Sequence, residues 1–306
     1  MIYAKLLLTA FFWGGTFIAG RAIAGIVDPY SAAFLRFAIA SFFLVLLTLK
    51  IEGRLPAING RQAVIIFLSG LTGIFAYNIL FFKGLTLINA NRASLIIATN
   101  PIFISLVSAL LFKEKLSALK ICGLVLSVSG ALIIISGGNP ADIFRVGIGM
   151  GDLAIFGCVL SWVIYSILGK PLTKELSPLA SVCYASLAGT LMLLIPALST
   201  GVVQHITGYG TMAWASLFYL GFFGTVLGFY WYYQGIRTIG PTKSGVFINF
   251  VPVSALVLSY FLLGETLTHA TLLGALLVIT GVYLTNASRP APAGPPGKQT
   301  GFDYSK

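Results

Sequence analysis

The sequence predicts an all-α integral membrane protein whose ten transmembrane helices form two inverted-topology five-helix repeats. Three observations lead to this class: an apolar composition, ten long apolar runs, and a second half that repeats the first. Of the 306 residues, 58% are hydrophobic and 9% are charged, and the mean hydropathy is +0.96. A soluble domain carries about 25% charged residues, so this chain has too few to cover a water-facing surface. Long apolar runs, instead of short alternating strands, argue against a β-barrel.

Ten apolar runs are each long enough to cross a bilayer, which takes about 20 residues of helix. Short loops with Pro, Gly and Asn separate them, as turns require. The first run is too long and too aromatic for a signal peptide, so we expect it to remain as a membrane helix. The tail at 288–306 is polar and rich in Pro and Gly, which predicts disorder. The expected spans are 4–26, 30–49, 62–85, 91–112, 117–137, 148–169, 178–199, 211–236, 242–263 and 268–287.

The chain aligns with itself without gaps at two offsets. An offset of 151 pairs Gly70/Gly221, Gly73/Gly224, Gly84/Gly235, Pro101/Pro252, Glu114/Glu265, Gly123/Gly274 and Gly130/Gly281; an offset of 149 pairs Trp13/Trp162, Gly20/Gly169, Arg21/Lys170 and Pro29/Pro178. We therefore expect a first repeat at 4–137 and a second at 148–287. Because each repeat has five spans, the second must start from the opposite side of the membrane, as in many secondary transporters.

The spacing of the paired glycines also predicts a packing contact. In each half two glycines lie seven residues apart, Gly123 with Gly130 and Gly274 with Gly281, so each pair occupies one helical face. We expect these faces to bring the fifth and tenth helices into close contact.

The distribution of basic residues predicts the orientation. With an even number of spans, 14 of the 19 Lys and Arg residues fall on the side of the termini, and five fall on the other. The positive-inside rule then places both termini in the cytoplasm. This asymmetry accounts for the net charge of +11 without nucleic-acid binding.

Four stretches carry a family resemblance. "FFWGGTF", "AAFLRFAIAS" and "GLTLINANRASLIIATNPIFISLVSALLFKEKLSALKICGLVLSVSGALII" resemble one EamA-type domain, and "GIRTIGPTKSGVFINFVPVSALVLSYFLLGETLTHATLLGALLVITGVYL" resembles a second. Two such domains are typical of the drug/metabolite transporter superfamily, and the chain is most similar to its YddG-type bacterial amino-acid exporters. The resemblance implies a secondary transporter in the bacterial inner (plasma) membrane, which works by alternating access and exports amino acids, especially aromatic and other apolar ones, or related small metabolites.

Other functions stay open at this stage. Within the superfamily, the chain could be a multidrug or nucleotide-sugar carrier; outside transport, it could be a membrane scaffold or sensor. The sequence has no Gly-x-Ser-x-Gly, Walker motif or paired carboxylates, so we expect no enzyme and no cofactor. Isolated Cys and His residues predict no metal site. The expected partners are a small-molecule substrate and the lipid bilayer; the oligomeric state stays open, and a monomer is consistent with the sequence.

Polar and aromatic residues inside the apolar spans are the candidates for a substrate cavity near the interface of the repeats. For each of them, ordinary helix packing is the alternative. Pro101 and Pro252 interrupt equivalent helices and are candidate gating positions, or static kinks. The cavity candidates are Trp13, Thr16, Tyr77, Asn78, Phe81, Ser94, Asn100, Trp162, Tyr165, Phe229, Ser244 and Asn249.

Four basic residues on the outer side, Arg21, Arg36, Lys83 and Arg92, could attract a substrate carboxylate. Snorkelling to the interface is the alternative, above all for Lys83 and Arg92. Asp28 lies between the two arginines of the first spans and is a candidate ion-pair partner. None of the eight acidic residues falls in the middle of a span. We therefore expect facilitated export, or coupling that does not pass through a buried acid.

Overall fold

The computed structural model describes residues 1–85, 87–88, 93, 96–136, 148–263 and 268–287. Of Arg21, Leu85, Leu256, Ser259, Leu262 and Leu263, it describes the backbone alone. In chain order, the helices are α1 (Ile2–Ile23), α2 (Pro29–Glu52), α3 (Gly60–Gly70), η1 (Leu71–Ala76), α4 (Tyr77–Leu85), α6 (Asn100–Phe112), α7 (Ala118–Ile135), α9 (Met150–Glu175), α10 (Pro178–Ser199), α11 (Val202–His205), η2 (Ile206–Gly208), α12 (Thr211–Gly221), η3 (Phe222–Leu227), α13 (Gly228–Gly245), η4 (Val246–Asn249), α14 (Phe250–Leu263) and α15 (His269–Ala287).

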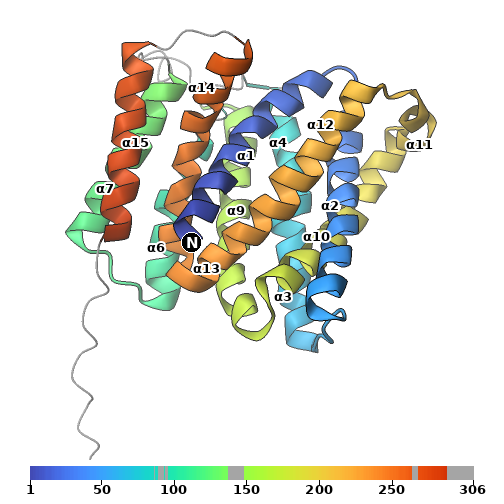
Figure 1. The fold of residues 1–306 in the computed structure, drawn as a ribbon, viewed down its shortest axis with the longest axis horizontal. Helices are drawn as coiled ribbons and strands as arrows, with labels where there is room; N and C mark the ends of the chain where they lie inside the picture. The colour runs from blue at the N-terminus through green and yellow to red at the C-terminus, as the bar shows by residue number, and fades with distance from the viewer. Residues whose placement is uncertain (86, 89–92, 94–95, 137–147, 264–267, 288–306) are drawn as a thin grey trace, which may run out of the picture.

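The helices form an all-helical membrane bundle, and each predicted span contains helix (Figure 1). Some bounds differ by a few residues, and a turn at Ala98 and Thr99 interrupts the span predicted at 91–112. Eight helical stretches are long and apolar enough to cross a membrane. One of them, Thr211–Ala255, has 45 residues and makes two passes, because Gly240 breaks the helix at φ 84° and ψ 164°. α6 is apolar but shorter; the start of its predicted span and the tail at 288–306 lie largely outside the described residues.

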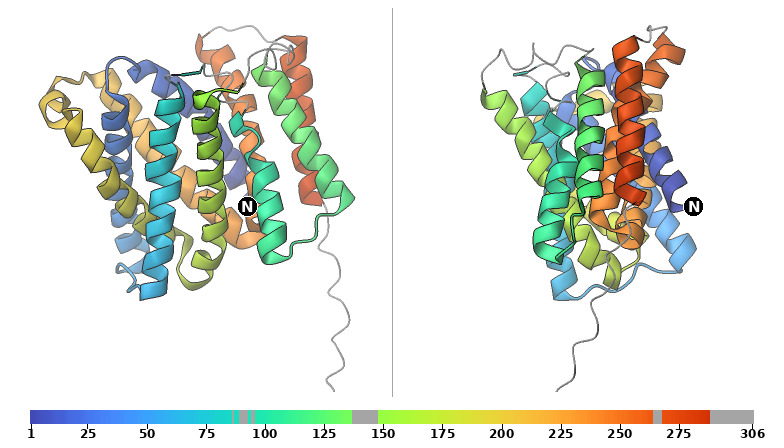
Figure 2. Two further views of the ribbon diagram at one scale, coloured as in Figure 1. Left: turned by 180° about the vertical axis from the view of Figure 1, so that it is seen from behind. Right: turned by 90° about the vertical axis from the view of Figure 1, so that its left-hand side faces the viewer.

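The predicted glycine contact between the fifth and tenth helices is confirmed. α7 and α15 lie side by side at one end of the molecule (Figure 2). A Cβ atom added to Gly130 would lie 2.5 Å from the carbonyl oxygen of Gly274, and one added to Gly281 would lie 2.5 Å from that of Gly123. The two helices run antiparallel, although they are equivalent in the sequence repeat.

A second pair of equivalent helices, α2 and α10, is also antiparallel. The hydroxyls of Ser41 and Thr190 lie 2.9 Å apart, and those of Ser31 and Thr200 lie 3.3 Å apart. From Ser31 to Ser41 the contacts advance along α2, while their partners on α10 run back from Thr200 to Thr190. Ser41 and Thr190 are themselves equivalent positions at the offset of 149.

Each half contains a six-residue π-helix, and the two π-helices, η1 and η3, are related by the same offset of 151. Each packs against the first two helices of the other half. A Cβ atom on Gly221, next to η3, would lie 2.9 Å from the backbone oxygen of Arg36 on α2; the equivalent Gly70, next to η1, would lie 2.9 Å from that of Ala185 on α10. The two halves therefore interlock around the π-helices, which are rare and frequently mark functional sites.

We predict that Gly281→Ala lowers the thermal stability of the detergent-solubilised protein, because its Cβ would meet the α7 backbone, which cannot rotate away. Overpacking of this kind costs about 1–3 kcal/mol. Gly20→Ala on α1 is the matched control, since a Cβ there meets nothing within 4 Å. Equal melting temperatures for the two variants would contradict the close contact.

Candidate functional site

An aromatic cluster fills the centre where α1, α4, α9 and α13 meet. It consists of Trp13, Tyr77, Trp162, Tyr165, Phe229, Tyr232 and Tyr233. The ring of Trp162 lies in the middle, with its centroid 5.5 Å from Trp13, 5.6 Å from Tyr77 and 5.3 Å from Phe229. Most of these pairs are tilted or edge-to-face, the arrangement that aromatic rings favour. The cluster brings together five predicted cavity residues from both halves.

The two repeat-equivalent tryptophans differ in their hydrogen bonding. The indole N–H of Trp13 donates to the carbonyl oxygen of Gly224 in η3 at 2.8 Å. The indole N–H of Trp162, which is only 7% exposed, and the hydroxyl of Tyr165 have no partner with hydrogen-bond geometry among the described residues, although the hydroxyls of Tyr232 and Tyr233 lie close to them. A buried polar group without a partner costs about 1–3 kcal/mol. The centre of the cluster thus keeps polar capacity that the described packing does not use.

Arg36 is the charged residue next to this cluster. It lies seven residues into α2, about 10 Å along the helix at 1.5 Å per residue. Its Nε–H donates to the hydroxyl of Thr225 in η3 at 2.9 Å, and its guanidinium lies 5.2 Å from the ring centroid of Phe37. Tyr77 is close enough for electrostatic interaction. Among the described residues, no carboxylate lies within ion-pair distance of Arg36.

The sequence offered Asp28 as a partner for Arg21 or Arg36. The side chain of Arg21 lies outside the described structure, and Asp28 makes no ion pair with Arg36. It accepts hydrogen bonds from the backbone N–H groups of Tyr30 and Ser31, and so caps the N-terminus of α2. Asp is among the preferred residues at this position.

Repeat symmetry shows that packing alone does not require an arginine at position 36. Its equivalent, Ala185, makes the same backbone contact to Gly70 that Arg36 makes to Gly221. The helices can therefore pack in this way without the guanidinium. Since an unpaired charge inside a bilayer is costly, it is a functional-site candidate by default.

The cluster has a partly accessible side and a buried side. Trp13, Thr16, Arg36 and Tyr77 keep part of their surface exposed, whereas Trp162, Tyr165 and Phe229 are buried. Thr16 and Arg36 both lie next to Gly224. A Cβ atom added to this glycine would lie 2.7 Å from the methyl group of Thr16 and 3.8 Å from the guanidinium of Arg36. Glycine at 224 thus lets both side chains approach the backbone of η3. The arrangement can present a cation, a hydroxyl and aromatic faces to one solute.

The other predicted cavity residues have local partners. Phe81 stacks on Tyr77 with the ring planes 11° apart. The amide of Asn78 donates to the carbonyl of Ile74 at 2.6 Å, that of Asn100 to Ile97 at 2.9 Å, and that of Asn249 to the hydroxyl of Ser127 at 3.0 Å. Ser244 is buried, and its hydroxyl lacks a partner within the described chain. Of these residues, Phe81 reaches the aromatic cluster, through its stacking on Tyr77.

Both predicted gating prolines lie in the first turn of a helix, just after an irregular turn. Pro101 is the second residue of α6 and follows the turn at Ala98 and Thr99. Pro252 lies in α14 and follows the 3₁₀ turn η4. The equivalent helices are therefore broken before the prolines, where a missing N–H costs no helical hydrogen bond.

Of the basic residues, Lys83 is exposed near the end of α4. The side chain of Arg21 lies outside the described structure, as do Arg92 and the cavity candidate Ser94.

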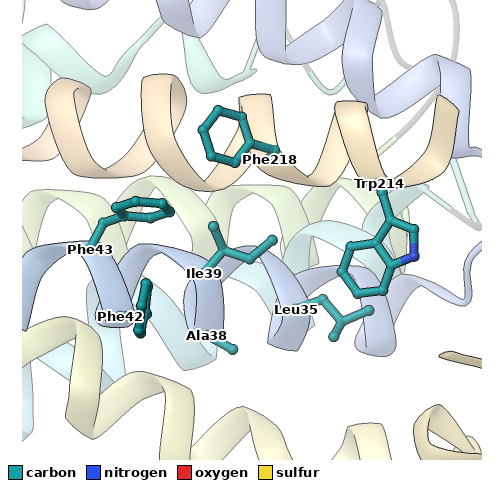
Figure 3. A pocket seen from close by; sticks show the side chains of 7 residues that line it. All are labelled: Leu35, Ala38, Ile39, Phe42, Phe43, Trp214 and Phe218. Carbon is teal, nitrogen blue, oxygen red and sulfur yellow. The ribbon is translucent and has the colours of Figure 1, made fainter. Parts of the chain in front are cut away.

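A surface hollow lies outside the cluster. It is a cavity of about 530 Å³ between α2 and α12, lined by Leu35, Ala38, Ile39, Phe42, Phe43, Trp214 and Phe218 (Figure 3). Phe42 is 60% exposed and Phe218 42%, as expected for side chains that face lipid. With no hydrogen-bonding group besides the Trp214 indole, this groove has little to recognise a polar solute.

Comparison with known proteins decides the family. The model of the EamA-like transporter family matches residues 1–136 and again residues 149–287. This chain belongs to the EamA-like transporter family. It is therefore a membrane transporter with two EamA domains and not an enzyme.

Relatives and one solved structure agree with this family. An uncharacterized transporter, YyaM of Bacillus subtilis (strain 168), is 31% identical over 281 residues, which cover 92% of each chain. A probable terminal-alkyne amino-acid exporter of Streptantibioticus cattleyicolor is 31% identical over 301 residues, 96% of this chain and 97% of that protein. A crystal structure with 18% sequence identity shares the fold, with a TM-score of 0.74 over 93% of this chain and 96% of that one.

Sequence reasoning did not select Thr225 or Gly224, which hold Arg36 and Trp13 in place. The sequence repeat could have pointed to Gly224, because this glycine is the equivalent of Gly73. The repeat could not predict the π-helical backbone, which makes Gly224 and Thr225 face α1 and α2.

Proposed function

We propose that this EamA-family protein exports amino acids, aromatic and other apolar ones above all, from the cytoplasm by alternating access. The observation that carries the proposal is Arg36, a cation within a span that has no carboxylate partner among the described residues and adjoins an aromatic cluster. An amino acid supplies what the site lacks: a carboxylate for the guanidinium and an apolar side chain for the rings. Arg pairs with carboxylates through two parallel N–H···O bonds. The name of the Streptantibioticus relative supports the same substrate class.

The arrangement of Arg36 suits this role. Thr225 accepts from Nε, which fixes the plane of the guanidinium and leaves its Nη groups for a ligand. Trp13 is held in place by Gly224, so one wall of the site is preorganised. A second polar group of the substrate would meet the hydroxyl of Thr16 or Tyr77.

We further propose that both termini are cytoplasmic and that the two halves are inverted repeats in a bacterial inner membrane. The basic residues support the orientation, and the antiparallel packing of α2 with α10 and of α7 with α15 supports the inversion. In inverted-repeat transporters, the substrate site lies at the repeat interface, and one bundle rocks against the other. The aromatic cluster occupies this interface.

The two rival substrates fit the site less well. A cationic drug would meet the like charge of Arg36, and like charges in a poorly hydrated site repel strongly. A nucleotide sugar carries two phosphates, whereas the described part of the site offers one guanidinium. A scaffold or sensor would not need an unpaired charge at its centre.

Flux through proteoliposomes tests the substrate. We predict transport of phenylalanine and leucine, and competition by compounds that keep the carboxylate but not by phenylethylamine. Arg36→Gln should weaken the apparent affinity by about 30-fold or more, because losing one partner of a buried charge pair costs about 2 kcal/mol or more. Arg61→Gln is the control, since this arginine is 72% exposed.

Two results would overturn the proposal. Transport of cationic drugs or nucleotide sugars alone would replace the substrate class. Unchanged phenylalanine affinity in a folded Arg36→Gln protein would remove Arg36 from the site.

The acidic residues suggest facilitated transport. Among the described residues, every Asp and Glu lies at a helix end or in a loop: Asp28, Glu52, Glu114, Asp152 and Glu175. We predict that collapsing the proton gradient with a protonophore leaves downhill amino-acid flux unchanged and that no uphill accumulation follows an imposed gradient. Accumulation that tracks the gradient would contradict this.

A further inference from the structure

Glu114 connects the two halves at the N-terminal face, defined as the end of the bundle where α1 begins and α2, α6 and α9 end (Figure 1). It follows α6 in the first half. Its Oε1 accepts from the ammonium of Lys170 on α9 at 2.7 Å, and its Oε2 accepts from the hydroxyl of Thr242 on α13 at 2.8 Å. Both oxygens of one carboxylate are thus bound to helices of the other half.

The partners of Glu114 are well enclosed. The side chains of Lys170 and Glu114 are 24% and 19% exposed, and Thr242 is buried. Lys170 also lies 4.0 Å from the ring centroid of Phe112, the last residue of α6. An ion pair with this burial and geometry is screened less than a surface pair.

Unusual backbone conformations flank the same carboxylate on both sides. Lys113, directly before Glu114, has φ 54°, and among the described residues it is the one non-glycine with positive φ. Gly240, which breaks α13, has φ 84° and ψ 164°, a region open essentially to glycine alone. A Cβ added to Gly240 would lie 3.3 Å from Oε1 of Glu114. Left-handed backbone at Lys113 turns the chain back toward α9, and the break at Gly240 brings Thr242 to the carboxylate.

Such strain persists only where the surrounding structure holds it in place, and it clusters at functional and switching sites. Here the left-handed residue Lys113 comes from the first half and the glycine break at Gly240 from the second, and both adjoin Glu114. Breaking the Glu114 contacts would remove the ion pair and the hydrogen bond that join the end of α6 to α9 and α13. These are helices that a rocking motion between the halves has to separate.

We infer that Glu114, Lys170 and Thr242 form the gate that closes the N-terminal face, and that their contacts must break before substrate loads from this side. The inference rests on the proposed alternating access, with the N-terminal face in the cytoplasm. It assigns the residues that control exposure of the site, separate from Arg36, which binds the solute.

The gate can be reached from water. A cavity of about 280 Å³ adjoins it, lined by Glu114, Lys170, Thr173 and Lys174 on one side and by Arg237 and Gly240 on the other. Hydrogen bonds from Lys170 and Thr242 outweigh burial and hold the pKa of Glu114 below its ordinary value of 4.5. The contacts are therefore intact at neutral pH and are lost as the pH falls through this lowered pKa.

The other charged groups beside Glu114 are all cations. Lys170, Lys174 and Arg237 line the same cavity. Lys243 on α13, itself close to Lys120 of α7, interacts electrostatically with Glu114, and Lys113 and Lys115 are the chain neighbours of Glu114. Among the described residues that line the cavity, Glu114 is the one carboxylate, so we assign an acid-pH change in these contacts to Glu114.

Distances between spin labels test the gate without any substrate. Labels at Lys115→Cys and Lys174→Cys, two exposed positions on opposite sides of the pair, are placed in a chain whose three native cysteines are replaced. We expect one short distance at pH 7, a longer population that grows as the pH is lowered stepwise below 4.5, and the longer population already at pH 7 in Glu114→Gln. Glu114→Gln should also lose the pH response.

Two further variants keep the test decisive. The exchange Glu114→Lys with Lys170→Glu should return most of the population to the short distance. Glu175→Gln, which removes the carboxylate paired with exposed Arg61, should leave the distances unchanged. A short distance retained in a folded Glu114→Gln protein would overturn the gate.

Transport separates this inference from the proposed function. In the same liposomes, Glu114→Gln should change the maximal rate several-fold and leave the apparent affinity near that of the unaltered protein, whereas Arg36→Gln should change the affinity. If no amino acid is transported but the label distances still respond as expected, the gate stands and the substrate is wrong.

Discussion

The central constraint on this molecule is the guanidinium of Arg36, which is held inside a span by the hydroxyl of Thr225 and has no described carboxylate beside it. A bilayer strongly disfavours such a charge, so its surroundings have to stabilise it and keep it available. The π-helix η3 supplies the hydroxyl, and Gly224 within η3 leaves the space in which Thr16 and Arg36 approach its backbone. The aromatic rings beside it lower the local polarity, which strengthens any pairing with a solute carboxylate.

The repeats supply the scaffold, and the differences between them supply the proposed site. Equivalent glycines bring each π-helix against the first two helices of the other half, which fixes the centre of the bundle. The polar groups of the proposed site lie at equivalent positions where the two halves differ. Arg36 corresponds to Ala185, and Thr16 corresponds to Tyr165. The indole N–H of Trp13 has a hydrogen-bond acceptor, whereas that of the equivalent Trp162 has none with hydrogen-bond geometry among the described residues. The same division holds at the N-terminal face, where Glu114 of one half is bound by Lys170 and Thr242 of the other. The helices linked there carry no part of the Arg36 contact.

Much of the fold could be predicted from the sequence, because apolar run lengths and glycine spacing follow directly from the bilayer and from helix geometry. The spans and the contact of α7 with α15 are of this kind. Symmetry and mid-span position also selected Trp13, Tyr77, Trp162 and Phe229, which the structure brings together. The π-helices, the Thr225 contact and the bond from Thr242 to Glu114 could not be predicted, since they depend on backbone turns and on tertiary approach. Asp28 caps α2 instead of pairing with Arg36, because the nearby backbone N–H groups of Tyr30 and Ser31 bind its carboxylate.

A structure of the protein with bound phenylalanine tests the account most directly. The account predicts that the substrate carboxylate lies within hydrogen-bond distance of the Nη groups of Arg36 and that the phenyl ring packs against Trp13 and Tyr77. Substrate bound elsewhere, with Arg36 still contacting only Thr225, would contradict it.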